Sequence, residues 1–132
     1  MQVGWPGRGA MGAPMAARAA RAGHVVRGYD VVPGRAASLA ADGVRPADTV
    51  PAAVGGADLI VIMVATPGQL EEALFAPGGA AGSLAAGSIV VVIATVGPGA
   101  VISAADRLAA GGVAVVDALV SGARRGPPPV TC

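Results

Sequence analysis

Three glycines near the start of the chain have the spacing of a phosphate-binding turn. Gly7, Gly9 and Gly12 form the pattern G-x-G-x-x-G, which follows a short apolar run and opens an alanine-rich stretch. In a strand–turn–helix unit the first glycine permits the tight turn, the second lets the backbone approach phosphate oxygens, and the third lets the helix pack against the strand. The free N–H groups of Ala10 and Met11 would then face a pyrophosphate from the positive end of the helix dipole. We therefore expect a dinucleotide at this turn.

An aspartate completes the pattern at the end of the next apolar run. Asp30 stands 18 residues after Gly12, as the last residue of the segment HVVRGYD. A carboxylate in this position accepts hydrogen bonds from the adenosine ribose hydroxyls, and its charge repels a 2′-phosphate. The sequence therefore predicts NAD as the cofactor rather than NADP, although Arg27 and Arg35 stand near enough to keep the opposite preference open.

Two other interpretations of these residues stay open. A glycine-rich turn and a strand-end aspartate can occur together by chance, and a methyltransferase nucleotide site also uses glycines and a strand-end aspartate. A Walker phosphate loop is excluded, because that loop needs a lysine and the chain contains none.

Two residues depart from an ordinary turn of this kind. Pro6 stands where the preceding strand should end, and it has no N–H group. We expect it to cost one hydrogen bond, about 1 kcal/mol, without moving the glycines. Arg8 stands between the first two glycines and is either a solvated side chain at the rim of the cleft or a cation that covers the pyrophosphate.

Short β-branched runs alternate with alanine-rich stretches along the chain, which is typical of a parallel sheet covered by helices on both faces. The pattern predicts strands over residues 1–5, 24–30, 44–45, 58–65, 88–95 and 113–120. It predicts helices over residues 10–22, 33–41, 67–75 and 99–110. We expect one α/β domain, residues 1–120, with a Rossmann-type doubly wound parallel sheet. Residues 121–132 contain three consecutive prolines, and we expect them to form an irregular, disordered tail.

Composition argues against several other classes of protein. A chain of 132 residues with a formal net charge of +1 gives no reason to expect a nucleic acid or an acidic membrane surface as partner. Its apolar runs are far shorter than the roughly 20 residues of a membrane span. Cys132 is the only cysteine, which excludes an internal disulfide and a metal cluster and favours a cytoplasmic location. Residues 1–29 have the arginine-rich, acid-free pattern of a mitochondrial presequence. Residues 1–30, however, also fit a complete strand–turn–helix–strand unit, which is the interpretation that we favour.

Five segments of the chain resemble, in order, the landmarks of the β-hydroxyacid dehydrogenase family. They are GRGAMGAPMA, AGHVVRGYD, IVIMV, GSIVVVIATVGPGA and VDALVSG, and the resemblance covers residues 1–123. This family includes 3-hydroxyisobutyrate dehydrogenase, tartronate semialdehyde reductase and L-threonate dehydrogenase, and residues 69–88 lean toward the last of these. The resemblance implies an oxidoreductase that transfers a hydride between NAD and the alcohol carbon of a small 2- or 3-hydroxy acid.

The resemblance also implies further cofactor contacts. Val64, Ala65 and Thr66 would line the adenosine side of the cleft. Thr95 would lie near the nicotinamide ribose and the substrate, because it ends a strand at the crevice where the strand order reverses. The alternative for Thr95 is that it only caps the element that follows it.

A substrate loop is implied after the last predicted strand. Ser121 and Gly122 would present a hydroxyl and backbone N–H groups to the substrate carboxylate, although Ser121 could also serve only as a cap. Leu119 stands where the family has a proline, and Ala123 stands where it has a second glycine.

The largest departure from the family concerns catalysis. The family's catalytic lysine lies in a helical C-terminal domain that also closes the active site, and this chain has neither that domain nor any lysine. The resemblance therefore implies an N-terminal cofactor domain only, truncated and inactive alone, which would take a hydroxy-acid substrate only when such a domain is supplied. The alternatives are a stand-alone dinucleotide-binding module or sensor without catalysis, and a gene fragment that folds poorly because an apolar face is uncovered.

Overall fold

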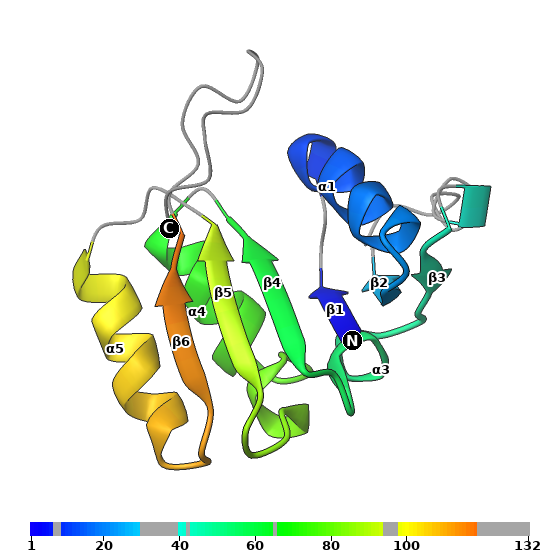
Figure 1. The fold of residues 1–132 in the computed structure, drawn as a ribbon. Helices are drawn as coiled ribbons and strands as arrows, with labels where there is room; N and C mark the ends of the chain where they lie inside the picture. The colour runs from blue at the N-terminus through cyan, green and yellow to red at the C-terminus, as the bar shows by residue number, and fades with distance from the viewer. Residues whose placement is uncertain (7–8, 30–39, 42, 65, 94–97, 119–132) are drawn as a thin grey trace.

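The computed structural model shows a six-stranded sheet with helices on both faces (Figure 1). It describes residues 1–6, 9–29, 40–41, 43–64, 66–93 and 98–118. The strands are β1 (Gln2–Pro6), β2 (Val25–Tyr29), β3 (Arg45–Pro46), β4 (Leu59–Met63), β5 (Ile89–Ile93) and β6 (Ala114–Asp117). Among the described residues the helices are α1 (Gly9–Arg21), α3 (Val50–Val54), α4 (Pro67–Phe75) and α5 (Pro98–Ala109), with a short 3₁₀ turn at Ala81–Ser83.

The strand order confirms the predicted doubly wound sheet. The order is β3-β2-β1-β4-β5-β6, and every neighbouring pair is parallel. From β1 the chain passes through α1 to β2 on one side, whereas β4 lies on the other side of β1. This is the order of a Rossmann fold, in which the two halves of the sheet meet between the first and fourth strands.

Most predicted elements are present with small shifts at their ends. The strands predicted over residues 24–30, 58–65, 88–95 and 113–120 are longer than β2, β4, β5 and β6. The strand predicted over residues 1–5 has the observed length but lies one residue later, at Gln2–Pro6. β3 lies at residues 45–46 instead of 44–45. α4 begins and ends at the predicted residues, since Thr66 caps it and Pro67 occupies its first turn. Of the predicted helix over residues 33–41 only 40–41 are described, and the predicted tail lies outside the described residues.

The sequence pattern does not predict α3. This helix has five residues, too few to show a helical period, and only its first turn carries a local signal. Thr49 caps it, with its side-chain oxygen accepting the N–H of Ala52 at 3.1 Å, and Pro51 stands in the first turn.

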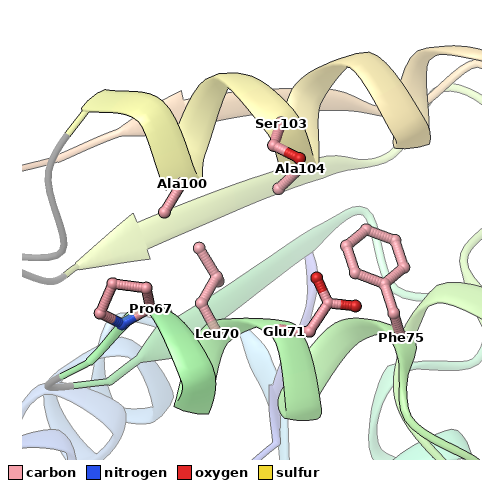
Figure 2. A pocket seen from close by; sticks show the side chains of 7 residues that line it. All are labelled: Pro67, Leu70, Glu71, Phe75, Ala100, Ser103 and Ala104. Atoms are coloured by element: carbon pink, nitrogen blue, oxygen red, sulfur yellow. The ribbon is translucent and has the colours of Figure 1, made fainter.

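α4 and α5 lie next to each other on one face of the sheet, with a shallow pocket between them (Figure 2). Nη1 of Arg107 in α5 donates to both carboxylate oxygens of Glu71 in α4, at 2.8 and 2.9 Å. The same guanidinium lies 3.4 Å from the ring centre of Phe75. Both charged side chains are exposed, so this contact joins the two helices at modest energetic gain, below about 1 kcal/mol.

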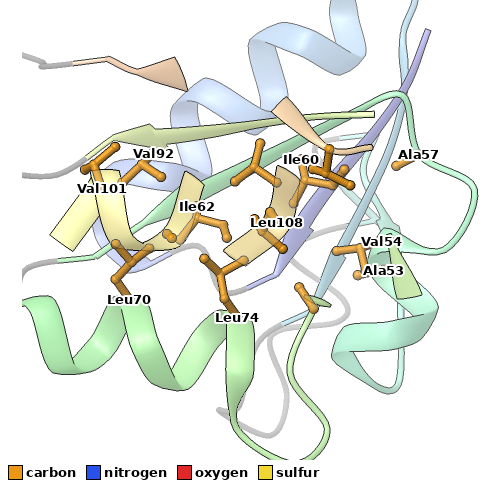
Figure 3. Close-up of a cluster of buried hydrophobic side chains, with 14 residues drawn as sticks. Ala53, Val54, Ala57, Ile60, Ile62, Leu70, Leu74, Val92, Val101 and Leu108 are labelled. Atoms are coloured by element: carbon orange, nitrogen blue, oxygen red, sulfur yellow. The ribbon is translucent and has the colours of Figure 1, made fainter. Parts of the chain in front are cut away.

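The apolar core is divided by the sheet into two clusters. On one face, residues of β4 and β5 pack against α3, α4 and α5, and Figure 3 shows Leu70 and Leu74 of α4 turned toward Ile62 of β4. On the other face, Ala16 of α1 packs with residues of β1, β2, β4 and β5, among them Trp5. The middle residues of β4 are buried on both faces, which explains why this strand is an apolar run instead of an alternating one.

α3 crosses β1 so closely that residue 4 has no room for a side chain. A Cβ atom on Gly4 would lie 2.7 Å from the carbonyl oxygen of Ala53 and 3.0 Å from Cα of Val54. Both atoms belong to the main chain of α3, which cannot turn aside as a flexible side chain can. The glycine at this position therefore sets the distance between α3 and β1.

We predict that Gly4→Ala lowers the free energy of unfolding by about 1–3 kcal/mol, because the new methyl group pushes α3 away from the sheet. Urea unfolding monitored by circular dichroism measures the change. Gly99→Ala is the matched control: its Cβ meets no atom within 4 Å, so this variant should be as stable as the parent or slightly more stable. Equal stability of the two variants would contradict the packing described for α3.

Candidate dinucleotide-binding site

The carboxyl ends of the strands mark the candidate site. Because all pairs are parallel, β1, β2, β4 and β5 end at the same edge of the sheet (Figure 1). The strand order reverses between β1 and β4, and in open α/β sheets ligands bind in the crevice outside the carboxyl ends at this switch point. The glycine-rich turn follows β1 and therefore belongs to this edge.

The N-terminus of α1 gives this edge a positive end of a helix dipole. α1 begins at Gly9, three residues after β1 ends at Pro6. Its first turn contains no acidic residue, and its last turn contains Arg18 and Arg21. The two arginines thus lie at the negative, C-terminal end of the helix dipole. No acidic side chain of the first turn neutralises the positive, N-terminal end, so the N-terminus of α1 is suited to bind an anion.

The predicted contact residues divide into three groups, of which one, Val64 and Thr66, follows β4. Gly9, Ala10, Met11 and Gly12 form the first turn of α1, as the glycine pattern predicts. Seven others lie outside the described residues: Gly7, Arg8, Asp30, Ala65, Thr95, Ser121 and Gly122.

The described ends of the strands show where several of these segments begin. β1 and β2 end level with each other, in the register pair Pro6↔Tyr29. β4 and β5 end in the register pair Met63↔Ile93. The described strand ends that precede the glycine turn, Asp30, Ala65 and Thr95 in the sequence therefore lie at one edge of the sheet.

Arg27 is engaged with α3. Its Nη1 donates to the carbonyl oxygen of Ala52 at 3.2 Å, and its Nη2 donates to the carbonyl oxygen of Gly55. These carbonyls belong to the C-terminal part of α3 and the residue that follows it, where a cation also matches the helix dipole. From the sequence, Arg27 could bind a 2′-phosphate. In the structure its guanidinium instead donates to two main-chain carbonyls of the protein. Arg35 lies outside the described residues.

Val64 and Thr66, the two described residues among the predicted contacts after β4, make contacts within the protein. Val64 is partly buried and packs against the core under α4 and α5. Thr66 is exposed, and its side-chain oxygen accepts the N–H of Gln69 at 3.1 Å as the cap of α4. Both residues follow the carboxyl end of β4, and Thr66 has a structural role as the cap of α4.

Trp5 forms part of the floor below the candidate site. It stands one residue before the end of β1, is only 3% exposed, and shares a buried cluster with Val61 of β4 and Ile93 of β5. The sequence gives no signal for this role beyond the position of the tryptophan next to the glycine-rich turn. Because it is the only tryptophan of the chain, its fluorescence reports on this place alone.

The pocket between α4 and α5 is not the predicted site. Its volume is about 190 Å³, and Leu70, Phe75 and Ala104 are among the residues that line it (Figure 2). Cavities that hold cofactors and other small molecules usually measure about 300–1,000 Å³. Among the described residues no group of three or more His, Cys, Asp or Glu side chains could hold a metal ion, and none of the helices described is long and apolar enough to cross a membrane.

We predict that Arg27→Met lowers the free energy of unfolding by about 1.5–3 kcal/mol, because two carbonyl oxygens at the end of α3 lose a charged donor. Arg45→Met, on the exposed strand β3, is the matched control and should change stability by less than about 0.5 kcal/mol. Urea unfolding of both variants measures the difference. Equal effects would show that the contacts of Arg27 with α3 contribute nothing to the fold.

Comparison with known proteins gives concordant results. A family model described as the NAD binding domain of 6-phosphogluconate dehydrogenase matches residues 2–128. The chain is 29% identical over 126 residues to 2-(hydroxymethyl)glutarate dehydrogenase of Eubacterium barkeri, which covers 96% of this chain and 42% of that protein. It is 36% identical over 121 residues to L-threonate dehydrogenase of Cupriavidus necator, covering 91% of this chain and 40% of that protein.

A solved structure agrees in fold as well as in sequence. The crystal structure of 3-hydroxyisobutyrate dehydrogenase from Salmonella typhimurium superposes with a TM-score of 0.83 at 34% identity, covering 91% of this chain and 42% of that one. The chain thus spans about two fifths of the length of the relatives it matches. The family model and the strand order together show that the chain belongs to the family of NAD-binding domains shared by 6-phosphogluconate dehydrogenase and the β-hydroxyacid dehydrogenases.

Proposed function

We propose that this domain binds NAD across the crevice between β1 and β4, with the glycine-rich turn around the pyrophosphate. The observation that carries the proposal is the junction of β1 and α1, where the G-x-G-x-x-G spacing falls on the turn between Pro6 and the helix that begins at Gly9. Gly7 and Gly9 would let the backbone approach the phosphates, and Gly12 would keep α1 close to the sheet. The N–H groups of the first turn would donate to the phosphate oxygens.

The other predicted contacts follow the same edge of the sheet. Asp30, directly after β2, would accept hydrogen bonds from the adenosine ribose hydroxyls, and Arg8 would add positive charge over the pyrophosphate. The contacts along the walls of the cleft would come from Val64, Ala65, Thr66 and Thr95. For Thr66 the cap of α4 limits this role, because its side-chain oxygen already accepts one hydrogen bond.

Two charges support NAD over NADP as the cofactor. Asp30 would face the 2′ position, where its carboxylate repels a phosphate. Arg27, the nearest described cation in the sequence, donates to main-chain carbonyls of α3 and the residue after it. A 2′-phosphate would therefore meet a carboxylate without the help of this guanidinium.

We further propose that the domain is the cofactor-holding part of a hydroxy-acid dehydrogenase and does not catalyse turnover alone. When bound, NAD supplies the nicotinamide ring that takes a hydride from the alcohol carbon of the substrate. Ser121 and Gly122 would hold the substrate carboxylate. The chain contains no lysine to act as the family's general acid and base, so the proton of the alcohol has no partner of that kind here.

An open apolar strip on the sheet supports the second proposal. Ile89 and Val116 are 39% and 48% exposed, and the register pairs Ile89↔Ala114 and Val91↔Val116 place all four side chains on one face. This is the face opposite α4 and α5, and no described helix covers it at β5 and β6 (Figure 1). Parallel sheets are normally covered on both faces, so this strip fits a domain that packs against a further part of a larger enzyme.

Titration with NADH and NADPH, followed by energy transfer from Trp5, tests the cofactor proposal. We expect saturable transfer with tighter binding of NADH. Asp30→Ser should lower the ratio of the dissociation constant for NADPH to that for NADH about tenfold, which corresponds to about 1.4 kcal/mol. Asp106→Ser, an exposed acid on α5, is the matched control and should leave both affinities unchanged.

Three results would contradict these proposals. Tighter binding of NADPH by the parent chain would overturn the cofactor preference, and the absence of saturable transfer would overturn cofactor binding. Turnover of 3-hydroxyisobutyrate or L-threonate by the chain alone would overturn the proposal that a further part is needed for catalysis.

Arg27→Met should leave the ratio of the affinities for NADH and NADPH unchanged, since the guanidinium of Arg27 donates to main-chain carbonyls of α3 and the residue after it.

A further inference from the structure

The hydrogen-bond ladder between β1 and β4 is shorter than the ladders on either side of it. It contains two register pairs, whereas the ladders β1–β2 and β4–β5 on either side contain five each. The last pair is Gly4↔Ile60, and the next one would join Trp5 and Val61. The ladder therefore stops two residues before β1 ends, directly below the switch-point crevice.

The direction of the main-chain groups explains where the ladder stops. The main-chain N–H and C=O groups of successive residues in a strand point alternately to the two neighbouring strands. The carbonyl of Met1 accepts the N–H of Val25 at 3.1 Å on the β2 side, and the carbonyl of Gln2 accepts the N–H of Asp58 at 2.8 Å on the β4 side. The main-chain N–H and C=O groups of the even-numbered residues of β1 thus point toward β4, and the nitrogen of Pro6 points the same way.

Pro6 removes the donor that the next pair requires. Its ring nitrogen carries no hydrogen, so it cannot donate to the carbonyl of Val61, and the pair between Trp5 and Val61 cannot form. Val61 is only 6% exposed. A carbonyl of a buried residue that loses its ladder donor costs about 1–3 kcal/mol when no other group replaces that donor, so another donor at this place would stabilise the fold.

A second buried polar group lies in the same cluster. Trp5 is 3% exposed, and its indole Nε1 is buried without a hydrogen-bond acceptor among the described residues. Trp5 and Val61 both belong to the cluster under α1, and the register that would pair them places their side chains on the same face of the sheet. Among the described residues, the indole N–H of Trp5 thus has no acceptor and the carbonyl of Val61 lacks its ladder donor, and the two residues occupy neighbouring positions on adjacent strands.

We propose that these two groups form a binding site for one internal water molecule, which accepts from the indole Nε1–H of Trp5 and donates to the carbonyl of Val61. A water fits this place because it has both functions, and internal waters typically satisfy such otherwise unpaired groups. The water takes over the function of the N–H that Pro6 lacks. It joins β1 to β4 under the crevice, and it does so whether or not a dinucleotide binds there.

Nuclear magnetic resonance of the ¹⁵N-labelled chain tests this site directly. Trp5 is the only tryptophan, so its indole N–H gives one resolved signal. We expect a cross-relaxation peak between this proton and a water that tumbles with the protein. In Pro6→Ala the new N–H should pair with Val61, become protected from hydrogen exchange and abolish the water peak.

Pro46→Ala is the matched control, because it also adds an N–H to a strand, on β3 at the edge of the sheet. The Trp5–water peak should be unchanged in this variant. No water peak in the parent chain, or the same water peak in Pro6→Ala, would overturn the proposal. A crystal structure in which Nε1 of Trp5 donates directly to a protein acceptor would overturn it as well.

A double-mutant cycle measures the energetic coupling of the two groups. Trp5→Phe should reduce the folding equilibrium constant about fivefold more in the parent chain than in the Pro6→Ala variant, because only the parent chain holds the water. The loss of packing is common to both backgrounds and cancels. Equal effects would overturn the proposal. If Trp5→Phe does not fold, the comparison of the parent chain with Pro6→Ala by nuclear magnetic resonance decides.

Discussion

The main-chain hydrogen bonds of β1 are the constraint on which the rest of the structure depends. β1 is shared by the two halves of the sheet, pairing with β2 over five residues and with β4 over two. α3 contacts its middle at Gly4, and α1 begins three residues after its end. A shift of β1 would therefore move the glycine-rich turn, the floor of the crevice and both flanking strands together.

The sequence predicts the parts of this arrangement that follow from local patterns. The apolar runs locate the central strands, and the pair Thr66–Pro67 fixes the start of α4. The glycine spacing locates the first turn of α1. Each of these features depends on residues that are close together in the sequence, so a single sequence is enough to predict it.

Contacts between distant segments are not predictable in this way. α3 is too short to show a period, so the partner of Arg27 is also missed, because that partner is the end of α3. The burial of Trp5 depends on α1 and on residues of three other strands, β2, β4 and β5. The effect of Pro6 depends on which neighbour its nitrogen faces, and this follows only from the strand order and register.

The central claim is that a dinucleotide lies across the carboxyl edge of the sheet at β1 and β4. Chemical-shift mapping of the ¹⁵N-labelled chain during titration with NAD tests it most directly. We expect saturable changes that are largest at the amides of α1's first turn and at the indole of Trp5, with little change between α4 and α5. Changes centred on Glu71, Phe75 and Ser103 at the pocket between those helices, or no saturable change at all, would contradict it.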